Sequence, residues 1–272
     1  MNSIRYRSGW LVTALYTLSL VLCALAVFPM LWMIYTSLQV PPGFNRTSGL
    51  ANYARVAQLI PLFKNFLNSV FTSVTGTVIT VFFCALGGFA FAKYRFPGRN
   101  FLFILLLFTM LIPPETGVVP TFIIMRRLNL INNLWSLIIP RAATAIGIFY
   151  MRQYISSFPD EIIESARIDG CSEFKIFIRI VGPVIIPALS SWAALSLIAR
   201  WNDFFWPLIF MRSRERFTLM PAISMLPISE GLSTPWPVIM AGTTIAVLPL
   251  ILGFFFLQRF QIEGLTLGSI KG

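Results

Sequence analysis

Charged residues are scarce and histidine is absent in this chain of 272 residues. Lys, Arg, Asp and Glu together make up 11% of the chain, whereas a typical soluble domain has about 25%. Apolar residues reach 57% and the mean hydropathy is +0.78, so there are too few polar side chains to cover a water-soluble globule. The absence of histidine excludes His-based catalytic triads, H-E-x-x-H metal sites and histidine proton relays.

Cysteine and acidic residues are also rare. Cys23, Cys84 and Cys171 are far apart and form no C-x-x-C pair, which excludes a disulfide framework and a structural zinc site built from cysteine alone. We expect them to serve as small apolar side chains. The 10 acidic and 21 basic residues leave a formal net charge of +11. In so apolar a chain, this excess indicates basic residues that flank membrane spans rather than a nucleic-acid-binding surface.

Six long stretches with few or no charges predict an all-α integral membrane protein with one transmembrane domain over 1–272. Crossing a bilayer takes about 20 mostly apolar residues. The predicted spans are residues 10–38, 65–92, 101–125, 134–155, 183–211 and 236–258. The first is too long for the apolar part of a signal peptide, so we expect it to be retained. Pro113, Pro114 and Glu115 indicate a protein-covered bend in the third span, and Asn65 and Asn68 are expected to donate hydrogen bonds to neighbouring helices.

The distribution of Lys and Arg predicts the orientation of the spans. An even number of spans places both termini on one side of the membrane. The segments on that side carry more Lys and Arg than the segments on the other side. Because basic residues concentrate in cytoplasmic segments, we expect both termini to be cytoplasmic.

The most informative polar segment is 156–182, between the fourth and fifth predicted spans, which holds half of the acidic residues. Its pattern predicts two short helices joined by a tight turn. Pro159 suits the first turn of a helix, and the acidic residues that follow it complement the helix dipole. Ile162, Ile163 and Ala166 recur at helical spacing, so we expect them to form one apolar stripe.

The second half of this segment predicts the turn and the second helix. Asp169 and Gly170 end the first helix, since glycine is favoured just after a last turn, and Ser172 suits the N-cap of the next helix. The residues expected on one face of that helix are Phe174, Phe177 and Ile178. Two such helices are too short to span a bilayer, so they either lie on its surface or dock in a groove of a partner protein. Long loops usually carry a function, which favours docking.

The sequence from 161 to 183 reads EIIESARIDGCSEFKIFIRIVGP. It resembles the EAA motif of bacterial ABC-importer permeases, in which Glu-Ala-Ala is followed by three residues, Gly, nine residues, Ile, one residue and Leu-Pro. The positions that match are Glu164, Ala166, Gly170, Ile180 and Pro183. Asp169 also matches, because the sugar-transporting branch typically has Asp-Gly here. Three positions depart from the motif: Ser165 and Cys171 replace Ala, and Gly182 replaces Leu.

The resemblance extends over almost the whole chain. KNFLNSVFTS and GGFAFAKYRFPGRNF look like the opening and closing of the family's second span. FYMRQYISSFPDEIIESARIDG looks like its approach to the EAA motif, RWNDFFWPLIF like its fifth span, and QRFQIEGLTLGSIKG like its C-terminus. These blocks, in this order, resemble the smaller permease subunit of maltose-type carbohydrate importers.

This resemblance implies a fold, a location and a set of partners. It implies a single permease domain of the type I importer kind, in the cytoplasmic membrane of a bacterium or archaeon, surrounded by lipid and without a cofactor. A second homologous permease would complete the substrate path, two cytoplasmic ABC ATPase subunits would supply energy, and an extracytoplasmic sugar-binding protein would deliver the carbohydrate. The sequence has no G-x-x-x-x-G-K-[ST] phosphate loop, so the chain is not itself an ATPase of that kind.

The resemblance also implies which residues couple the permease to an ATPase. These are Glu164, Ala166, Asp169, Gly170 and Phe174. Glu164 is the candidate for an ion pair with a basic residue of the ATPase, whereas Asp169 with Gly170 shapes the turn. The alternative is that both carboxylates are ordinary solvated surface groups.

Polar residues in the fifth predicted span are candidates for the substrate path. A charge within a span marks a functional site by default, and aromatic rings beside amides suit the apolar face and the hydroxyls of a sugar. The candidates are Trp201, Asn202, Asp203 and Trp206, with Glu115 from the third span. The alternative is bracing, in which Arg200 and Asp203 pair with each other or brace neighbouring spans, and Glu115 pairs with Arg141.

Other classes of membrane protein fit the sequence less well. An ion-coupled secondary transporter would show histidine or lysine relays beside buried acids, and often internal repeats, but the chain has no histidine and no evident repeat. An integral membrane enzyme would need a cluster of catalytic polar groups, and none is evident. An ABC permease for a non-sugar solute, or for a sugar phosphate or polyol, stays open.

Overall fold

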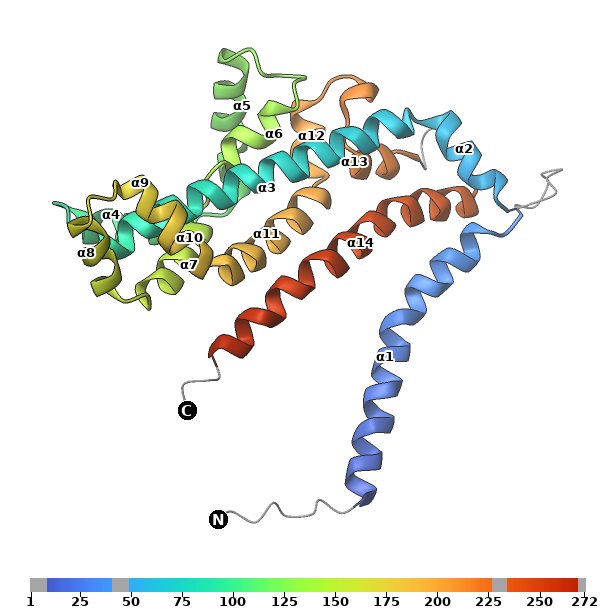
Figure 1. The fold of residues 1–272 in the computed structure, drawn as a ribbon. Helices are drawn as coiled ribbons and strands as arrows, with labels where there is room; N and C mark the ends of the chain where they lie inside the picture. Colours follow the sequence, from blue (N-terminus) through green and yellow to red (C-terminus); the bar gives the residue numbers. More distant parts are fainter. Residues whose placement is uncertain (1–8, 41–48, 227–233, 269–272) are drawn as a thin grey trace. The chain divides into compact units, whose positions relative to one another are not determined.

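The computed structural model describes residues 9–40, 49–226 and 234–268. Every regular element in those residues is a helix (Figure 1), in agreement with the expected all-α class. The three longest helices are α1 (Gly9–Ser37), α3 (Leu62–Lys93) and α14 (Trp236–Gly268). The others are α2 (Ala51–Leu59), α4 (Arg99–Thr109), η1 (Pro114–Gly117), α5 (Val118–Arg127), α6 (Trp135–Ile138), η2 (Ile139–Arg141), α7 (Ala145–Ser156), α8 (Asp160–Ile168), α9 (Glu173–Ile176), η3 (Phe177–Val181), α10 (Gly182–Val184), α11 (Ile186–Trp201), α12 (Phe205–Phe210), η4 (Arg214–Arg216) and α13 (Leu219–Ser224).

The chain divides into two compact units, of which the first comprises residues 1–59 and 225–245. In this unit Asn52 on α2 donates through Nδ2 to the carbonyls of Ser37 and Gln39, at 2.9 and 2.8 Å. The hydroxyls of Ser37 and Tyr53 share a hydrogen bond of 2.7 Å. These contacts tie α2 to the end of α1 and satisfy carbonyls that a helix end leaves open. Large apolar side chains are exposed along α1, as expected for a helix surrounded by other apolar groups in a membrane.

The second unit comprises residues 60–224 and 246–272, and α3 is its central helix. Helices α7 and α11 pack along α3, and small residues allow the close approach. A Cβ atom on Gly88 would lie 2.5 Å from Cβ of Met151, and one on Gly147 would lie 2.5 Å from Sγ of Cys84. Cys84 is buried as expected, but its Sγ also accepts a hydrogen bond from the Thr144 N–H at 3.4 Å, whereas Cys23 is exposed.

Helix length and composition support three membrane spans among the described residues: Val12–Ser37, Leu62–Lys93 and Trp236–Phe255. Two bent helix pairs bring the number to five if each pair is one span. Arg99–Thr109 and Pro114–Arg127 meet at 96°, and Glu173–Val184 and Ile186–Trp201 meet at 83°. Prolines lie at or next to both bends, because proline lacks the N–H that would continue the helix.

The structure differs from the sequence prediction in the fourth and fifth spans. Residues 134–155 do not form one helix: α6 and η2 end before Thr144, which begins α7 by accepting a hydrogen bond from the Gly147 N–H at 3.3 Å. Pro140 interrupts the first part. Residues 183–211 are likewise divided, because α11 ends at Trp201 and α12 is separate. Apolar composition predicted continuous helices at both places, although Pro207 indicated a kink in the fifth span; the break in the fourth span was missed.

Candidate functional site

The segment 156–182, called the docking loop below, contains the two predicted helices and the tight turn between them. Helix α8 follows Pro159, and Asp160 and Glu161 lie in its first turn. At its end the N–H of Gly170 donates to the carbonyl of Arg167 and the N–H of Cys171 donates to that of Ala166, both at 3.0 Å. This is the Schellman pattern of a helix end. Gly170 has φ of 76°, which only glycine adopts at low cost.

One face of the docking loop is buried against α3 and α7. Ile163, Ala166 and Phe177 are at most 6% exposed and belong to one apolar cluster with Phe89 and Met151. Ala166 is therefore an anchor of the loop and does not itself form a contact surface for a partner. Its small size lets α8 lie close to the helices beneath it.

The other face of the docking loop is exposed. Glu164 and Asp169 are exposed, as a partner contact requires, and Phe174 is 57% exposed. Ile168, with 88% of its surface accessible, adds a second large apolar side chain to this face. An exposed aromatic side chain such as Phe174 is typical of a protein-binding surface.

Two predicted faces of the docking loop are wrong in detail. Ile162 is 44% exposed and does not continue the stripe of Ile163 and Ala166. Phe174 and Ile178 are exposed, at 57% and 49%, but Phe177 is buried. Phe177 begins a π-helical turn over 177–181 and packs with Phe89 of α3, at 5.4 Å between ring centroids, whereas Phe174 and Ile178 lie four residues apart on the open side.

The end of α3 holds the start of α8. The ammonium of Lys93 donates to the Phe158 carbonyl at 2.5 Å and to the Asp160 carboxylate at 2.6 Å. The Lys93 side chain is only 4% exposed, whereas that of Asp160 is 70% exposed. The hydrogen bond from Lys93 holds the pKa of Asp160 below its ordinary value.

The next residue of the chain holds the start of α9. The hydroxyl of Tyr94 donates to Glu173 Oε2 at 2.5 Å, and Arg167 on α8 pairs with Glu173 Oε1 at 2.7 Å. Hydrogen bonds from Arg167 and Tyr94 lower the pKa of Glu173. Burial, reinforced by the Glu173 carboxylate, raises the pKa of Tyr94 to about 12. The two helices of the docking loop are thus joined to each other and to the end of α3.

Lys93 and Tyr94 were not among the residues expected at this site. The sequence carried one signal for them, since they lie within the block that resembles the closing of the family's second span. Their separation from Asp160 and Glu173 by more than sixty residues concealed the contact, because pairing over such a distance is a property of the tertiary fold.

The polar residues expected in the fifth span are braced by other helices. The guanidinium of Arg141 donates to Asp203 Oδ2 at 2.5 Å, and Asp203 Oδ1 accepts from the Trp206 N–H at 3.2 Å. Arg200 and Asp203 therefore do not pair with each other, but Asp203 braces a neighbouring helical segment, which was the other possibility. The expected Arg141–Glu115 pair is wrong. Both pairings followed from closeness in sequence or in predicted span, which does not determine how the helices face one another.

Arg200 instead crosses to α3 and to the segment before α7. It donates through Nη2 to Thr80 Oγ1 at 2.6 Å and to the Arg141 carbonyl at 2.7 Å, and through Nη1 to the Leu137 carbonyl at 3.2 Å. Arg200 is only 6% exposed, so these bonds compensate its removal from water. A Cβ on Gly76 would lie 2.5 Å from Nη1 of Arg200, which means that this helix position must stay small.

The other path candidates have different surroundings. Trp201 is buried and donates through Nε1 to the Ala246 carbonyl at 2.9 Å. Trp206 is half-buried, and its ring stacks on Phe210 at 5.5 Å between centroids. Asn202 and Glu115 are exposed. The structure brings Asp203 and Trp206 together and leaves Asn202 as the most open of the four fifth-span candidates.

The described residues contain no group of three or more His, Cys, Asp and Glu side chains that could hold a metal ion.

Comparison with known proteins identifies relatives over nearly the full length. The family described as binding-protein-dependent transport system inner membrane component matches residues 84–266. The arabinooligosaccharides transport system permease protein AraQ of Halalkalibacterium halodurans is 34% identical, over 97% of both chains. Its Bacillus subtilis counterpart is 39% identical over 77% of this chain and 74% of its own. The lactose transport system permease protein LacG of Rhizobium radiobacter is 32% identical, over 91% of this chain and 92% of its own.

A solved structure shares the fold. One chain in the crystal structure of a bacterial ABC transporter involved in the import of the acidic polysaccharide alginate has a TM-score of 0.80 and 24% identity, covering 95% of this chain and 99% of its own. The family match takes in more than half of the chain, including the docking loop. It confirms the resemblance seen in the sequence and decides against an ion-coupled transporter or an enzyme. The chain therefore belongs to the family of inner membrane permease components of binding-protein-dependent transport systems.

Proposed function

We propose that the chain is the permease subunit of an ATP-driven importer for a carbohydrate, and that the docking loop couples it to a cytoplasmic ATPase. The observation that carries this proposal is the two-sided construction of the loop. One face is fixed on α3 and α7 by Ile163, Ala166 and Phe177, while Glu164 and Phe174 stay exposed. A rigidly held, exposed surface of this kind transmits a partner's movement to the helices beneath it.

The rest of the assembly follows from the family. We infer a second homologous permease that completes the substrate path, two ATPase subunits and an extracytoplasmic binding protein. Six spans, with the third, fourth and fifth bent or broken as described above, would place both termini and the docking loop on the cytoplasmic side.

A carbohydrate is the solute that the relatives favour. Their names specify arabinooligosaccharides, lactose and polygalacturonan or rhamnogalacturonan. A second candidate is a small non-sugar or polyol-like solute, because the osmoprotective compounds uptake permease protein GgtD of Synechocystis is 31% identical over 82% of this chain. Radiolabelled uptake in cells that express the complete transporter, with these solute classes as competitors, distinguishes the two.

The coupling role is tested with Glu164→Lys. We expect the variant to insert normally but to lose co-purification of the ATPase and substrate-stimulated ATP hydrolysis, because it places the wrong charge at the docking face. Glu215→Lys is the matched control, since it makes the same charge change at another exposed carboxylate. Unaltered hydrolysis and uptake in Glu164→Lys would refute the coupling role.

The path candidates are tested with a pair of variants. Because Asp203 is held by Arg141 and Trp206, we propose that it braces the wall of the path, and that the exposed Asn202 is the group open to solute. Asp203→Ala should reduce the yield of assembled transporter, whereas Asn202→Ala should assemble normally and change uptake or solute preference. Normal assembly of Asp203→Ala with altered uptake would instead assign solute contact to Asp203.

A further inference from the structure

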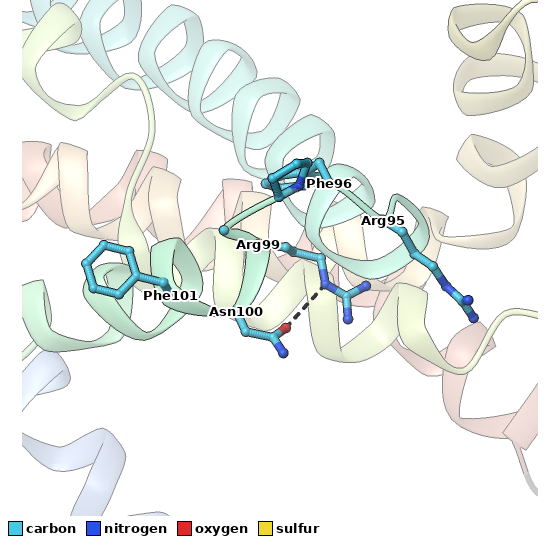
Figure 2. A pocket seen from close by; sticks show the side chains of 7 residues that line it. Arg95, Phe96, Arg99, Asn100 and Phe101 are labelled. Carbon is cyan, nitrogen blue, oxygen red and sulfur yellow. Dashed lines mark hydrogen bonds between the residues drawn. The ribbon is translucent and has the colours of Figure 1, made fainter.

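A basic hollow lies at the connection between α3 and α4, and its Arg95 also borders a second hollow that Asp160, Glu164 and Arg167 of the docking loop line. The basic hollow has a volume of about 500 Å³ and is lined by Arg95, Phe96, Pro97, Gly98, Arg99, Asn100 and Phe101. These lining residues include two arginines and no acidic residue. Figure 2 shows the Arg95 and Arg99 side chains extending to one side of the connection, with the Phe101 ring directed away from them. The hollow is therefore suited to an anion.

The two arginines are not neutralised by the groups that they contact. Arg99 donates to the Tyr94 carbonyl at 3.1 Å and to Asn100 Oδ1 at 3.4 Å (Figure 2), and both acceptors are neutral. Arg95 is exposed, and no ion pair forms at it within the described ranges. Its charge acts on the Asp160 carboxylate at longer range, but that carboxylate is already paired with Lys93 at 2.6 Å. Positive charge thus remains available at the hollow.

An apolar surface continues directly from the hollow along α4. The exposed fractions of Phe101, Ile104, Leu105 and Phe108 are 69%, 51%, 50% and 59%. They recur at the spacing of one helix face. The opposite side of α4 turns inward, where Phe103 is buried beneath the guanidinium of Arg152, 3.8 Å from its ring centroid. The hollow therefore has cationic groups at one end and a lipid-compatible stripe at the other.

We propose that this site binds an anionic phospholipid, with its phosphate on Arg95 and Arg99 and an acyl chain along the exposed stripe of α4. Guanidinium groups bind phosphate oxygens in pairs of charge-assisted hydrogen bonds, and basic pockets at the ends of membrane helices bind acidic headgroups. The stripe selects a lipid over a free phosphate, because only a lipid has a chain to cover it. The proposal needs only a membrane-embedded chain and is independent of the transported solute.

Native mass spectrometry of the full-length chain in detergent tests the site, with dioleoylphosphatidylglycerol and dioleoylphosphatidylcholine added in turn. The native chain should retain the phosphatidylglycerol preferentially. The double variant R95Q/R99Q should lose that preference by on the order of 30-fold, which corresponds to about 1 kcal/mol for each basic residue near an anionic headgroup. R95K/R99K keeps both charges and should retain most of the preference, which separates loss of charge from misfolding.

Two control experiments distinguish lipid binding at this hollow from a general charge effect and from binding of a free phosphate. R126Q/R127Q removes two charges from other exposed arginines, in α5, and should leave the preference unchanged. Glycerol phosphate and inorganic phosphate should not displace the bound lipid. Equal lipid retention by R95Q/R99Q and the native chain would overturn the proposal. So would an equal loss in R126Q/R127Q, or displacement by either free phosphate.

Discussion

At its N-terminal end α3 binds a neighbouring turn through asparagine amides, whereas at its C-terminal end it binds the docking loop through charged groups and a tyrosine. Asn65 donates through Nδ2 to the carbonyls of Arg214 and Phe217, each at 2.8 Å, and is fully buried. At the other end Lys93 pairs with Asp160, whose side chain is 70% exposed. One helix is thus fastened by neutral, buried bonds at one end and by ionic, partly hydrated bonds at the other.

This difference indicates different tasks for the two ends. Neutral hydrogen bonds to backbone carbonyls do not respond to pH, and their loss leaves buried acceptors without partners. Exposed ion pairs contribute little stability and weaken with salt. They therefore suit the attachment of a loop that is expected to move when a partner binds. The sequence expectation that Asn65 and Asn68 donate hydrogen bonds is confirmed, although their acceptors lie in the turn at 214–217 rather than on another span.

The largest effect is expected for Asn65→Ala. It removes the Asn65 bonds to the Arg214 and Phe217 carbonyls, at a cost of about 2–4 kcal/mol. The Phe217 carbonyl keeps its bond from Asn68. The apparent unfolding temperature in detergent should fall by several degrees. Asn68→Ala is the matched control, because Asn68 also donates to the Phe217 carbonyl but is less buried, and its effect should be smaller. Equal shifts would show that burial does not distinguish the two amides.

Lys93→Met should have an intermediate effect on stability and a large effect on coupling. Methionine keeps most of the side-chain volume but removes the bonds to the Phe158 carbonyl and to Asp160, at a cost of about 1–2 kcal/mol. The start of α8 should loosen, which is measurable as faster amide hydrogen exchange at 160–168. If the amides of 160–168 in Lys93→Met stay as protected from exchange as in the native chain, Lys93 has no positioning role.

Tyr94→Phe should have a smaller effect, confined to α9. It removes only the hydroxyl that donates to Glu173 Oε2, and Arg167 still holds that carboxylate. The expected loss is about 0.5–1.5 kcal/mol. The hydrogen exchange of 173–176 should rise while that of 160–168 stays unchanged. A rise in both segments would mean that Arg167 and Tyr94 act as one unit.

The smallest effect is a difference in pH dependence between the two ends. The pKa values of Asp160 and Glu173 are lowered, so their contribution is present above about pH 4, their ordinary range, and is lost as pH falls through the lowered values. The raised pKa of Tyr94, about 12, has the opposite sign, so its contribution is lost only as pH rises toward that value. The stability difference between Lys93→Met and the native chain should shrink below about pH 4, whereas the difference for Asn65→Ala should not. If the stability differences of both variants change with pH in the same way, the two ends of α3 do not differ in their pH dependence.

Local pattern predicted the helices of the docking loop correctly. Pro159, the acidic first turn and Asp169–Gly170 set the ends of α8, because these signals act within one or two turns of chain. The faces were predicted less well. Phe174 and Ile178 are exposed, whereas Phe177 is buried and packs with Phe89 of α3 at 5.4 Å between ring centroids.

Apolar composition alone determined that the chain is a helical membrane protein, and the spacing of the EAA segment located the loop that we propose as the docking site. These follow from the sequence because the bilayer demands long apolar helices and because a turn or helix cap acts locally. The ion pairs were decided only by the tertiary structure. Asp203 bonds to Arg141, sixty-two residues away, rather than to Arg200, three residues away, since the packing of α11 on α3 directs Arg200 toward Thr80. Which charges meet inside the protein depends on how the helices face each other, and no local pattern encodes that.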